Sequence, residues 1–230
     1  MEIGLGNSLA TARGISGPSG LNPDYVKLRL HFDSDFSDSS IHDRLPTLIG
    51  SSTIDTVEKV FGDGSMKNPG LSDMISFPAS SDFNMGDSIP FQLSWRMRRT
   101  SGSQAVFFAV GNYNNGYILA SNGNWTAVEI GSNNAVQGSW PYSVLINTWV
   151  AYRFNHDGAN NYRWYVNGVL LSIKVITGMV DASLPFVVGG RLTNTGMAGN
   201  FDEVLFEKHA DLVVTTDLTY EVETTAFPDP

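Results

Sequence analysis

Carboxylates are the side chains that could catalyse hydrolysis in this sequence, and their spacing argues against that chemistry. A retaining glycosidase needs two carboxylates about 5–5.5 Å apart, which a strand supplies at positions i and i+2 or i+4 of one face. Glu203 directly follows Asp202, so a regular strand places the two on opposite faces, and Glu129 stands alone. Glu221 and Glu223 have i, i+2 spacing, but they belong to an acidic tail, where a solvated edge is the simpler interpretation. Glycan hydrolysis is therefore disfavoured.

The histidines do not supply a catalytic or zinc site either. His31, His42, His156 and His209 are scattered along the chain, and no G-x-S-x-G, H-E-x-x-H or phosphate-loop motif occurs. A lone histidine in a turn is ordinarily solvated polar surface. The sequence thus predicts a protein without enzymatic activity.

Aromatic and amide side chains gather in three turn-rich segments, at residues 112–117, 122–126 and 133–142. A sugar site needs an aromatic platform for the apolar C–H face and polar groups for the hydroxyl rim. The candidate glycan-binding residues in these segments are Tyr113, Asn114, Trp125, Trp140 and Tyr142. The alternative is that the tryptophans and tyrosines pack into the ends of a sandwich, while the asparagines adopt the left-handed backbone conformation that tight turns require.

Period-two alternation predicts the elements that would position these segments. Apolar and polar residues alternate along 26–32 and 91–98, which is typical of half-buried antiparallel strands. Asn167-Gly168 separates two runs rich in aromatic and β-branched residues, and predicts a type I′ turn joining strands 162–166 and 169–175. Helical periodicity is weak, with one turn expected at most within 52–61. Further strands are expected at 105–110, 116–120, 125–130, 149–154, 186–188 and 201–206.

Length and composition fit a single β-sandwich domain. The chain has 230 residues, of which 42% are hydrophobic and 16% charged, and such sandwiches often reach this size as one unit. The net charge of −9 argues against a nucleic-acid partner. No apolar run approaches the ~20 residues that span a bilayer, so no membrane partner is expected. The absence of cysteine excludes disulfides, thiolate metal sites and cysteine nucleophiles.

The two ends differ from the middle of the chain. Residues 1–24 are rich in Gly, Ser, Asn and Pro and are expected to form an irregular arm that contacts a neighbour in an assembly, or folds back on its own domain. The arm lacks a basic n-region and an apolar h-region, so it is not expected to be a secretory signal. Residues 25–209 are expected to form the domain. The acidic extension 210–230 contains β-prone stretches and is expected to add an edge strand.

Several short motifs follow one another in an order that resembles the concanavalin A-like, laminin-G-like jelly-roll domains. They are LRLHFDSDFSDSS, VFGDGSM, ISFPASSDFNMGD, FQLSWRMR, WVAYRFNHDG, WYVNGV, PFVVGGR and GNFDEVLF, and they run from Leu28 to Phe206. The resemblance implies an antiparallel jelly-roll sandwich. It constrains function less, because this fold is shared by lectins, hydrolases and structural modules. The E-x-D-x-E pattern of the glucanase branch is missing.

The resemblance also implies a structural calcium ion. In similar domains the first and last of the matched strands lie side by side, with ion ligands near an aspartate on each. By that carry-over, Asp33 and Asp202 are the candidate calcium ligands. The alternative is that Asp202 accepts backbone N–H groups and caps a turn.

The two ends resemble laminin-G-like modules of tailed-phage structural proteins, because the chain opens with G-L-G-N-S-L and closes with F-P-D-P. We therefore expect a non-enzymatic virion protein, a capsid decoration or tail fibre. Residues 1–24 would anchor it to other virion proteins, and its loops would bind host-surface glycans. The alternatives are an extracellular carbohydrate-binding adhesin or lectin and, less favoured, a glycan hydrolase. Homo-oligomerisation is left open by the sequence.

Overall fold

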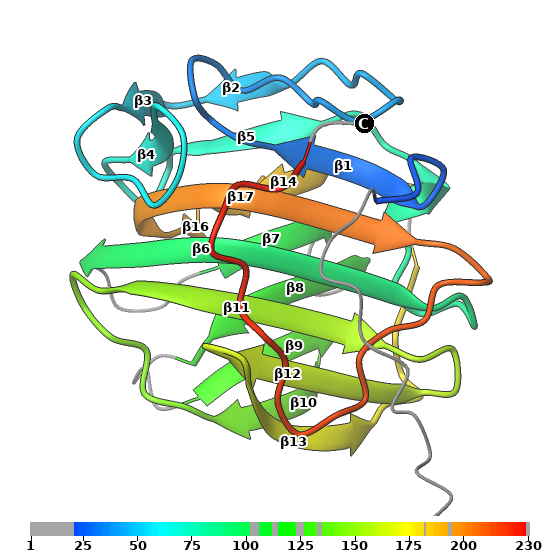
Figure 1. The fold of residues 1–230 in the computed structure, drawn as a ribbon. Helices are drawn as coiled ribbons and strands as arrows, with labels where there is room; N and C mark the ends of the chain where they lie inside the picture. The colour runs from blue at the N-terminus through cyan, green and yellow to red at the C-terminus, as the bar shows by residue number, and fades with distance from the viewer. Residues whose placement is uncertain are drawn as a thin grey trace, which may run out of the picture.

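The alternating segments pair into two antiparallel sheets that face each other (Figure 1). A computed structural model of the chain describes residues 21–101, 106–111, 115–122, 127–132, 135–181, 183–192 and 195–228. Sheet A has the strand order β13-β12-β11-β6-β17-β4-β3, with β1 also paired to β17, and sheet B has the order β10-β9-β8-β7-β14-β5-β2. The predicted all-β antiparallel sandwich is therefore confirmed.

The strands of the two sheets have the following bounds. Sheet A contains β1 (Val26–Leu30), β3 (Thr53–Asp55), β4 (Ser65–Asn68), β6 (Phe91–Ser101), β11 (Trp149–His156), β12 (Asn161–Val166), β13 (Val169–Val175) and β17 (Ala198–Lys208). Sheet B contains β2 (Thr47–Ile49), β5 (Met74–Phe77), β7 (Val106–Gly111), β8 (Gly116–Ser121), β9 (Ala127–Ser132), β10 (Ala135–Pro141) and β14 (Phe186–Val188). A short separate ladder joins β15 (Gly190–Arg191) and β16 (Thr195–Gly196), and Ser81–Phe83 form a 3₁₀ turn, η1.

An aromatic core fills the space between the sheets. The ring of Trp95 on β6 stacks on Tyr152 of β11 with ring centroids 5.2 Å apart, and Trp140 lies 5.5 Å from Trp164. Because each such ring buries roughly 150–250 Å², this cluster supplies much of the hydrophobic stabilisation. The apolar residues that alternate along β6 and, from Leu28 onward, along β1 belong to this core, as the sequence predicts. Val26 instead lies with Leu205 and Phe227, because a register shift separates it from Leu28.

The predicted Asn-Gly hairpin is present. Asn167 and Gly168 have φ values of 47° and 81°, the positive angles that a type I′ turn requires. The helical turn expected within residues 52–61 is wrong. Thr53 to Asp55 instead form β3, because they pair with β4 in register Thr53↔Lys67. Sheet pairing therefore decides the conformation of a segment whose own periodicity is weak.

The C-terminal extension does not add an edge strand, so that expectation is also wrong. After β17 the chain descends to the β12–β13 hairpin and then returns diagonally over the outer face of sheet A (Figure 1, red). The turning point is fixed by Leu170 N–H donating to Leu218 O at 2.9 Å and by Tyr220 N–H donating to Gly168 O at 2.8 Å. We call residues 209–228 the strap.

Side chains on the outer face of sheet A hold the strap in place of a backbone ladder. Asn155 Nδ2 donates to Thr215 O at 3.1 Å, and the Tyr165 hydroxyl donates to the carbonyls of Thr215 and Asp217 at 3.1 and 3.0 Å. Phe227 near the end of the strap is buried with Val26 and Leu205. Because polar side chains of the sheet satisfy the carbonyls of the strap, it lies flat on the sheet without forming a strand.

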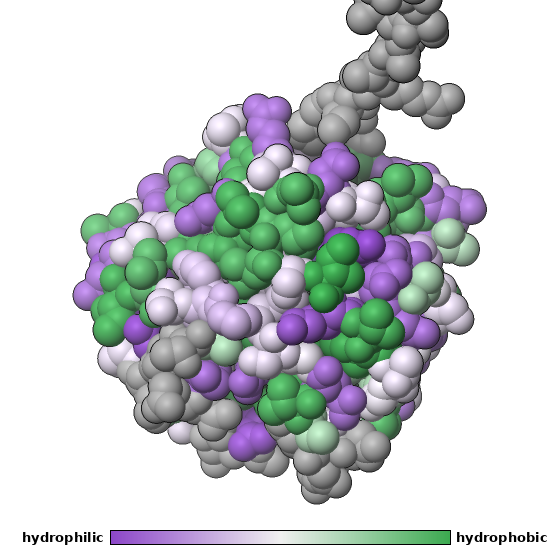
Figure 2. All heavy atoms as spheres, turned by 90° about the horizontal axis from the view of Figure 1, so that it is seen from below, coloured by the Kyte–Doolittle hydropathy of each residue, from purple (hydrophilic) through white to green (hydrophobic). Residues whose placement is uncertain are grey.

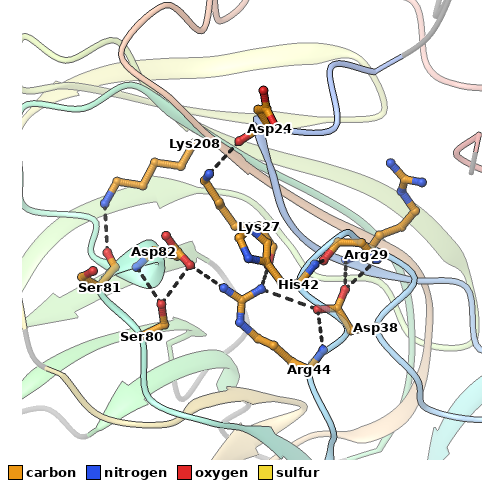
Figure 3. Close-up of polar contacts among 11 residues, drawn as sticks. Asp24, Lys27, Arg29, Asp38, His42, Arg44, Ser80, Ser81, Asp82 and Lys208 are labelled. Atoms are coloured by element: carbon orange, nitrogen blue, oxygen red, sulfur yellow. Dashed lines mark hydrogen bonds and ion pairs between the residues drawn. The ribbon is translucent and has the colours of Figure 1, made fainter. Parts of the chain in front are cut away.

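A polar cluster fixes the long connection after β1 (Figure 3). Asp38 Oδ1 accepts the Arg29 N–H at 3.0 Å, and Asp38 Oδ2 accepts the Arg44 N–H at 3.2 Å. The Arg44 guanidinium pairs with Asp82 of η1 and lies 5.0 Å from the centroid of the Phe83 ring. Charge-assisted bonds of this kind are stronger than neutral ones, so this connection is held firmly against the sandwich.

The edge strands β10 and β13 close one end of the sandwich, which Figure 2 views from below, with hydrophobic groups lying among polar ones. The indole N–H of Trp140 on β10 donates to Ser172 O on β13 at 2.9 Å, which ties the two sheets together there.

At the start of the described chain, Leu21 packs on the cluster around Phe227. Residues 1–20 of the predicted arm lie outside the described residues. Within the described part, the chain has no helix with the length and hydrophobicity needed to cross a membrane.

Candidate functional site

The outer face of sheet A carries an arginine pair at its centre. Alternation along β6 and β11 turns Trp95 and Tyr152 into the core, so Arg96 and Arg153 point outward. The register pairs Ala151 with Arg96 and Arg153 with Ser94, which makes the two arginines diagonal neighbours about 7–8 Å apart at the backbone. Arg96 is 6% exposed and Arg153 is 9% exposed. Two guanidinium groups are thus held close together at positions largely shielded from water.

Glu223 of the strap lies between these two arginines. Arg153 Nη2 donates to Glu223 Oε1, while Arg96 Nη2 donates to the Glu223 carbonyl at 2.6 Å and lies 3.5 Å from Oε2. The ring of Tyr220 stacks on the Arg153 guanidinium, 3.7 Å from Cζ to the ring centroid. The solvated-edge interpretation fits Glu221, which is exposed, but is wrong for Glu223, whose side chain is only 17% exposed. The reason is that the strap folds over the sheet instead of extending its edge.

Two cavities flank Glu223. One, of about 240 Å³, lies beside Phe61, Arg96, Trp149 and Asn167, and we call it the Trp149 cavity. The other, of about 520 Å³, lies among strap residues 212–228 over a floor that includes Gln92, Arg153 and Glu207, and we call it the strap cavity. Ligand sites typically measure about 300–1,000 Å³ and combine apolar walls with a few polar groups. The strap cavity falls within this range, whereas the Trp149 cavity is smaller and opens widely to the surface.

The Trp149 cavity has the side chains that sugar recognition needs. Trp149 and Phe61 are partly exposed, and Arg96 lies over the Phe61 ring, 5.5 Å from its centroid. Asn167 adds an amide at the hairpin turn, fixed by its Oδ1 accepting the Ala151 N–H at 3.0 Å. Aromatic rings can pack on the C–H face of a sugar while guanidinium and amide groups bond its hydroxyls. This arrangement suits a carbohydrate better than an apolar ligand.

Asp202 positions the loop that carries Phe61. Its Oδ2 accepts the N–H groups of Val60 and Phe61 at 2.7 and 3.1 Å, and its Oδ1 is buried without a hydrogen-bond partner. Burial outweighs these bonds and raises the pKa of Asp202 to about 7. A β-bulge follows, with Glu203 at φ 50°. A regular strand would place Asp202 and Glu203 on opposite faces. The bulge interrupts the alternation of β17 at this point, so that prediction does not apply.

Asp33 binds the same loop. Its Oδ1 accepts the Asp63 N–H at 2.6 Å, and a Cβ on Gly62, which has φ +55°, would overlap the Asp33 carboxylate. The two predicted calcium ligands are thus brought to one loop as hydrogen-bond acceptors, the role that the alternative interpretation gave to Asp202. Across the described ranges, no three or more His, Cys, Asp and Glu side chains form a group suited to a metal ion. Calcium at Asp33 and Asp202 stays a prediction.

The predicted glycan-binding residues are not assembled into one site. Trp140 is 0% exposed, so its proposed role as a surface platform is wrong, because the inner face of β10 turns it into the core. Tyr142 is partly buried and packs edge-on against Tyr152, with centroids 6.1 Å apart at 87°. Tyr113, Asn114 and Trp125 lie outside the described residues. The packing role that was the alternative fits Trp140 and Tyr142.

Sequence reasoning missed Trp149, Arg96 and Arg153 as site residues, although a signal for them exists. The alternation that predicts strand 149–154 turns its even-numbered residues inward and therefore turns Trp149 and Arg153 outward. This row therefore combines a large aromatic residue with an arginine, two side-chain types that sugar recognition uses. No comparable signal predicts Phe61 or Glu223, because loop and strap conformations bring them to this face.

Residues 69–210, more than half of the chain, match the family described as the "Concanavalin A-like lectin/glucanases superfamily". The chain belongs to this superfamily. The predicted resemblance to concanavalin A-like, laminin-G-like domains is therefore confirmed. No curated protein gives a significant sequence match.

Solved structures of similar fold include toxin and arabinanase domains. The receptor-binding domain of the botulinum neurotoxin C/D mosaic serotype aligns with a TM-score of 0.62 and 14% identity, covering 80% of this chain and 48% of the other. Domain 4 of AbnA, a GH43 extracellular arabinanase from Geobacillus stearothermophilus in complex with arabinotriose, aligns with a TM-score of 0.60 and 16% identity, covering 80% and 92%. The chain spans about half the length of the neurotoxin structure. At such identities the likeness shows the shared fold, and neither structure is a phage protein.

Proposed function

We propose that this chain is a carbohydrate-binding domain without enzymatic activity, and that the Trp149 cavity is its sugar site. The observation that carries the proposal is the placement of Trp149 and Phe61 beside Arg96 and Asn167 in one concavity. The arabinanase domain in complex with arabinotriose and the receptor-binding domain of the neurotoxin support the binding role. Extracellular glycans are the ligands that this role implies.

Titration calorimetry with a panel of oligosaccharides, including arabinotriose, tests the proposal. Trp149→Ala removes the proposed platform and should weaken the best ligand about tenfold, which corresponds to ~1.4 kcal/mol. Tyr142→Ala is the matched control, because it truncates a partly buried aromatic residue that the sequence also nominates. Equal losses in both variants, or an unchanged affinity in Trp149→Ala, would contradict the assignment. A reducing-sugar assay on the same panel should detect no release.

A structural place in a virion is the second proposal, and the terminal motifs G-L-G-N-S-L and F-P-D-P are what favour it. In this proposal the N-terminal arm anchors the domain to other virion proteins, and sugar binding serves attachment to a host surface. Deleting residues 1–20 should leave a folded domain that binds sugar but no longer joins the particle. Incorporation of the truncated chain at normal occupancy would contradict the anchoring role.

A further inference from the structure

The strap places a carboxylate where the two cavities of sheet A meet. Glu223 lines both the Trp149 cavity and the strap cavity, while Arg96 lines the first and Arg153 the second. The two guanidinium groups hold Glu223 by one ion pair each, and Tyr220 stacks on one of them. The Glu223 carboxylate therefore has an arginine on each side and open space in both directions. The carboxylate of a bound ligand would be held in the same way.

We propose that Arg96 and Arg153 form the subsite for the carboxylate of an acidic glycan. In this proposal the Glu223 carboxylate occupies the subsite in the free protein, and the ligand displaces it. The proposal rests on the proposed function and names its ligand class, a polysaccharide containing uronic acid. Arginine binds carboxylates through a planar set of donors and stays charged. The guanidinium groups that now hold Glu223 can therefore bind a sugar carboxylate, and neither arginine has to gain or lose a proton.

The surroundings of the arginine pair favour a sugar over an acidic peptide. An extended peptide is commonly bound by pairing with an exposed strand edge, whereas these arginines point from the face of the sheet. Trp149 and Phe61 lie in the cavity next to Arg96 and offer a platform for the sugar that follows the charged one. The strap cavity continues the space on the side of Arg153. A glycan chain with one carboxylate at Glu223 could thus extend in both directions.

The strap is built so that it can open locally. Its residues form no strand, and the hydrophobic side chains Val213 and Leu218 are exposed, whereas Val214 and Phe227 are buried and anchor the strap near its two ends. Most of its hydrogen bonds to the sheet come from side chains, as at Asn155 and Tyr165. Segments with few packed apolar contacts open at low free energy. When the strap is open in only a fraction of the molecules, the apparent affinity equals the intrinsic affinity multiplied by that fraction.

Calorimetry on the full-length chain tests the proposal with trigalacturonate as the acidic probe and arabinotriose as the neutral one. Glu223→Gln keeps the shape of the side chain but removes the competing charge. We expect it to raise the ratio of acidic to neutral affinity about tenfold. Asp24→Asn is the control, because it removes an exposed charge at a residue that lines neither cavity, and it should leave the ratio unchanged. Adding Arg153→Gln to Glu223→Gln should abolish the gain, with melting curves confirming that each variant is folded.

Each outcome separates the inference from the proposed function. Binding of arabinotriose that depends on Trp149, with no gain for trigalacturonate in Glu223→Gln, overturns the inference and leaves the proposed function standing. Failure of every variant to bind either sugar overturns both. Tighter binding of polyglutamate than of trigalacturonate would replace the glycan with an acidic peptide. Hydrogen exchange in residues 219–228 should rise when trigalacturonate binds, and unchanged exchange would contradict displacement of the strap.

Discussion

The buried carboxylate of Asp202 should make the stability of this domain fall as pH rises through neutrality. Burial raises the pKa of Asp202 to about 7 from an ordinary value of 3.8. The folded protein therefore holds this proton more tightly than the unfolded chain does. The resulting stabilisation is fully present below about pH 4 and is lost as pH rises through 7. Asp202→Asn removes this titration while keeping a side chain of the same shape.

The size of the effect follows from the two pKa values. One proton changes the free energy of unfolding by at most about 1.4 kcal/mol per pH unit between them. From pH 5 to pH 8 the contribution of Asp202 should fall by about 2–3 kcal/mol. For a domain of this size that corresponds to a shift of the melting temperature by roughly 5–10 °C.

Urea unfolding of the wild type and of Asp202→Asn at pH 5 and pH 8 measures this effect, because the difference between the two proteins cancels the other titrating groups. The wild type should lose about 2–3 kcal/mol more than the variant over this range. Asp24→Asn is the control for an exposed aspartate and should match the wild type at both pH values. A difference between wild type and Asp202→Asn that does not change with pH would show that Asp202 titrates near its ordinary value, and would refute the reasoning.

Other consequences concern the core, the loop and the predicted ion. Trp140→Ala should lower the free energy of unfolding in urea by about 3–5 kcal/mol, because it leaves a cavity beside Trp164; a loss below 1 kcal/mol would contradict its place in the core. Gly62→Ala should lower the free energy of unfolding in urea by about 1–3 kcal/mol and weaken sugar binding, because it forces a Cβ at φ +55° against Asp33. Unchanged unfolding and affinity would show that this loop does not position the sugar site. If calcium binds Asp33 and Asp202, excess chelator should lower the melting temperature by roughly 5–10 °C, whereas an unchanged curve leaves both as hydrogen-bond acceptors.

Much of the fold can be predicted from the sequence, because strand alternation and turn chemistry are local signals. The Asn167-Gly168 hairpin follows from the positive φ angles that only certain residues tolerate. The inward rows of β6 and β11 follow from period two, and the described parts of the other predicted strands are also present. The ordered motifs predict the jelly-roll superfamily, which the match over residues 69–210 confirms.

The candidate site could not be predicted in full, because it depends on where two irregular segments lie. Glu223 has the composition of a solvated tail and becomes part of a buried ion-pair network only when the strap crosses the sheet. Phe61 reaches the outer face through a loop held by Asp202 and Asp33, which are distant from each other in sequence. Trp140 illustrates the converse error, since its place next to a turn predicts a surface platform although its strand turns it inward.

The indole N–H signals of the five tryptophans offer the most direct test of the proposed sugar site. They can be followed in an ¹⁵N-correlated NMR spectrum during titration with the best oligosaccharide of the panel, after assignment with Trp149→Phe. Trp149 should shift with ligand concentration, while the buried Trp140, bonded to Ser172 O, should stay in place. Binding that shifts Trp125 and leaves Trp149 unmoved would favour the predicted glycan-binding segment 122–126 and contradict the outer face of sheet A as the sugar-binding surface.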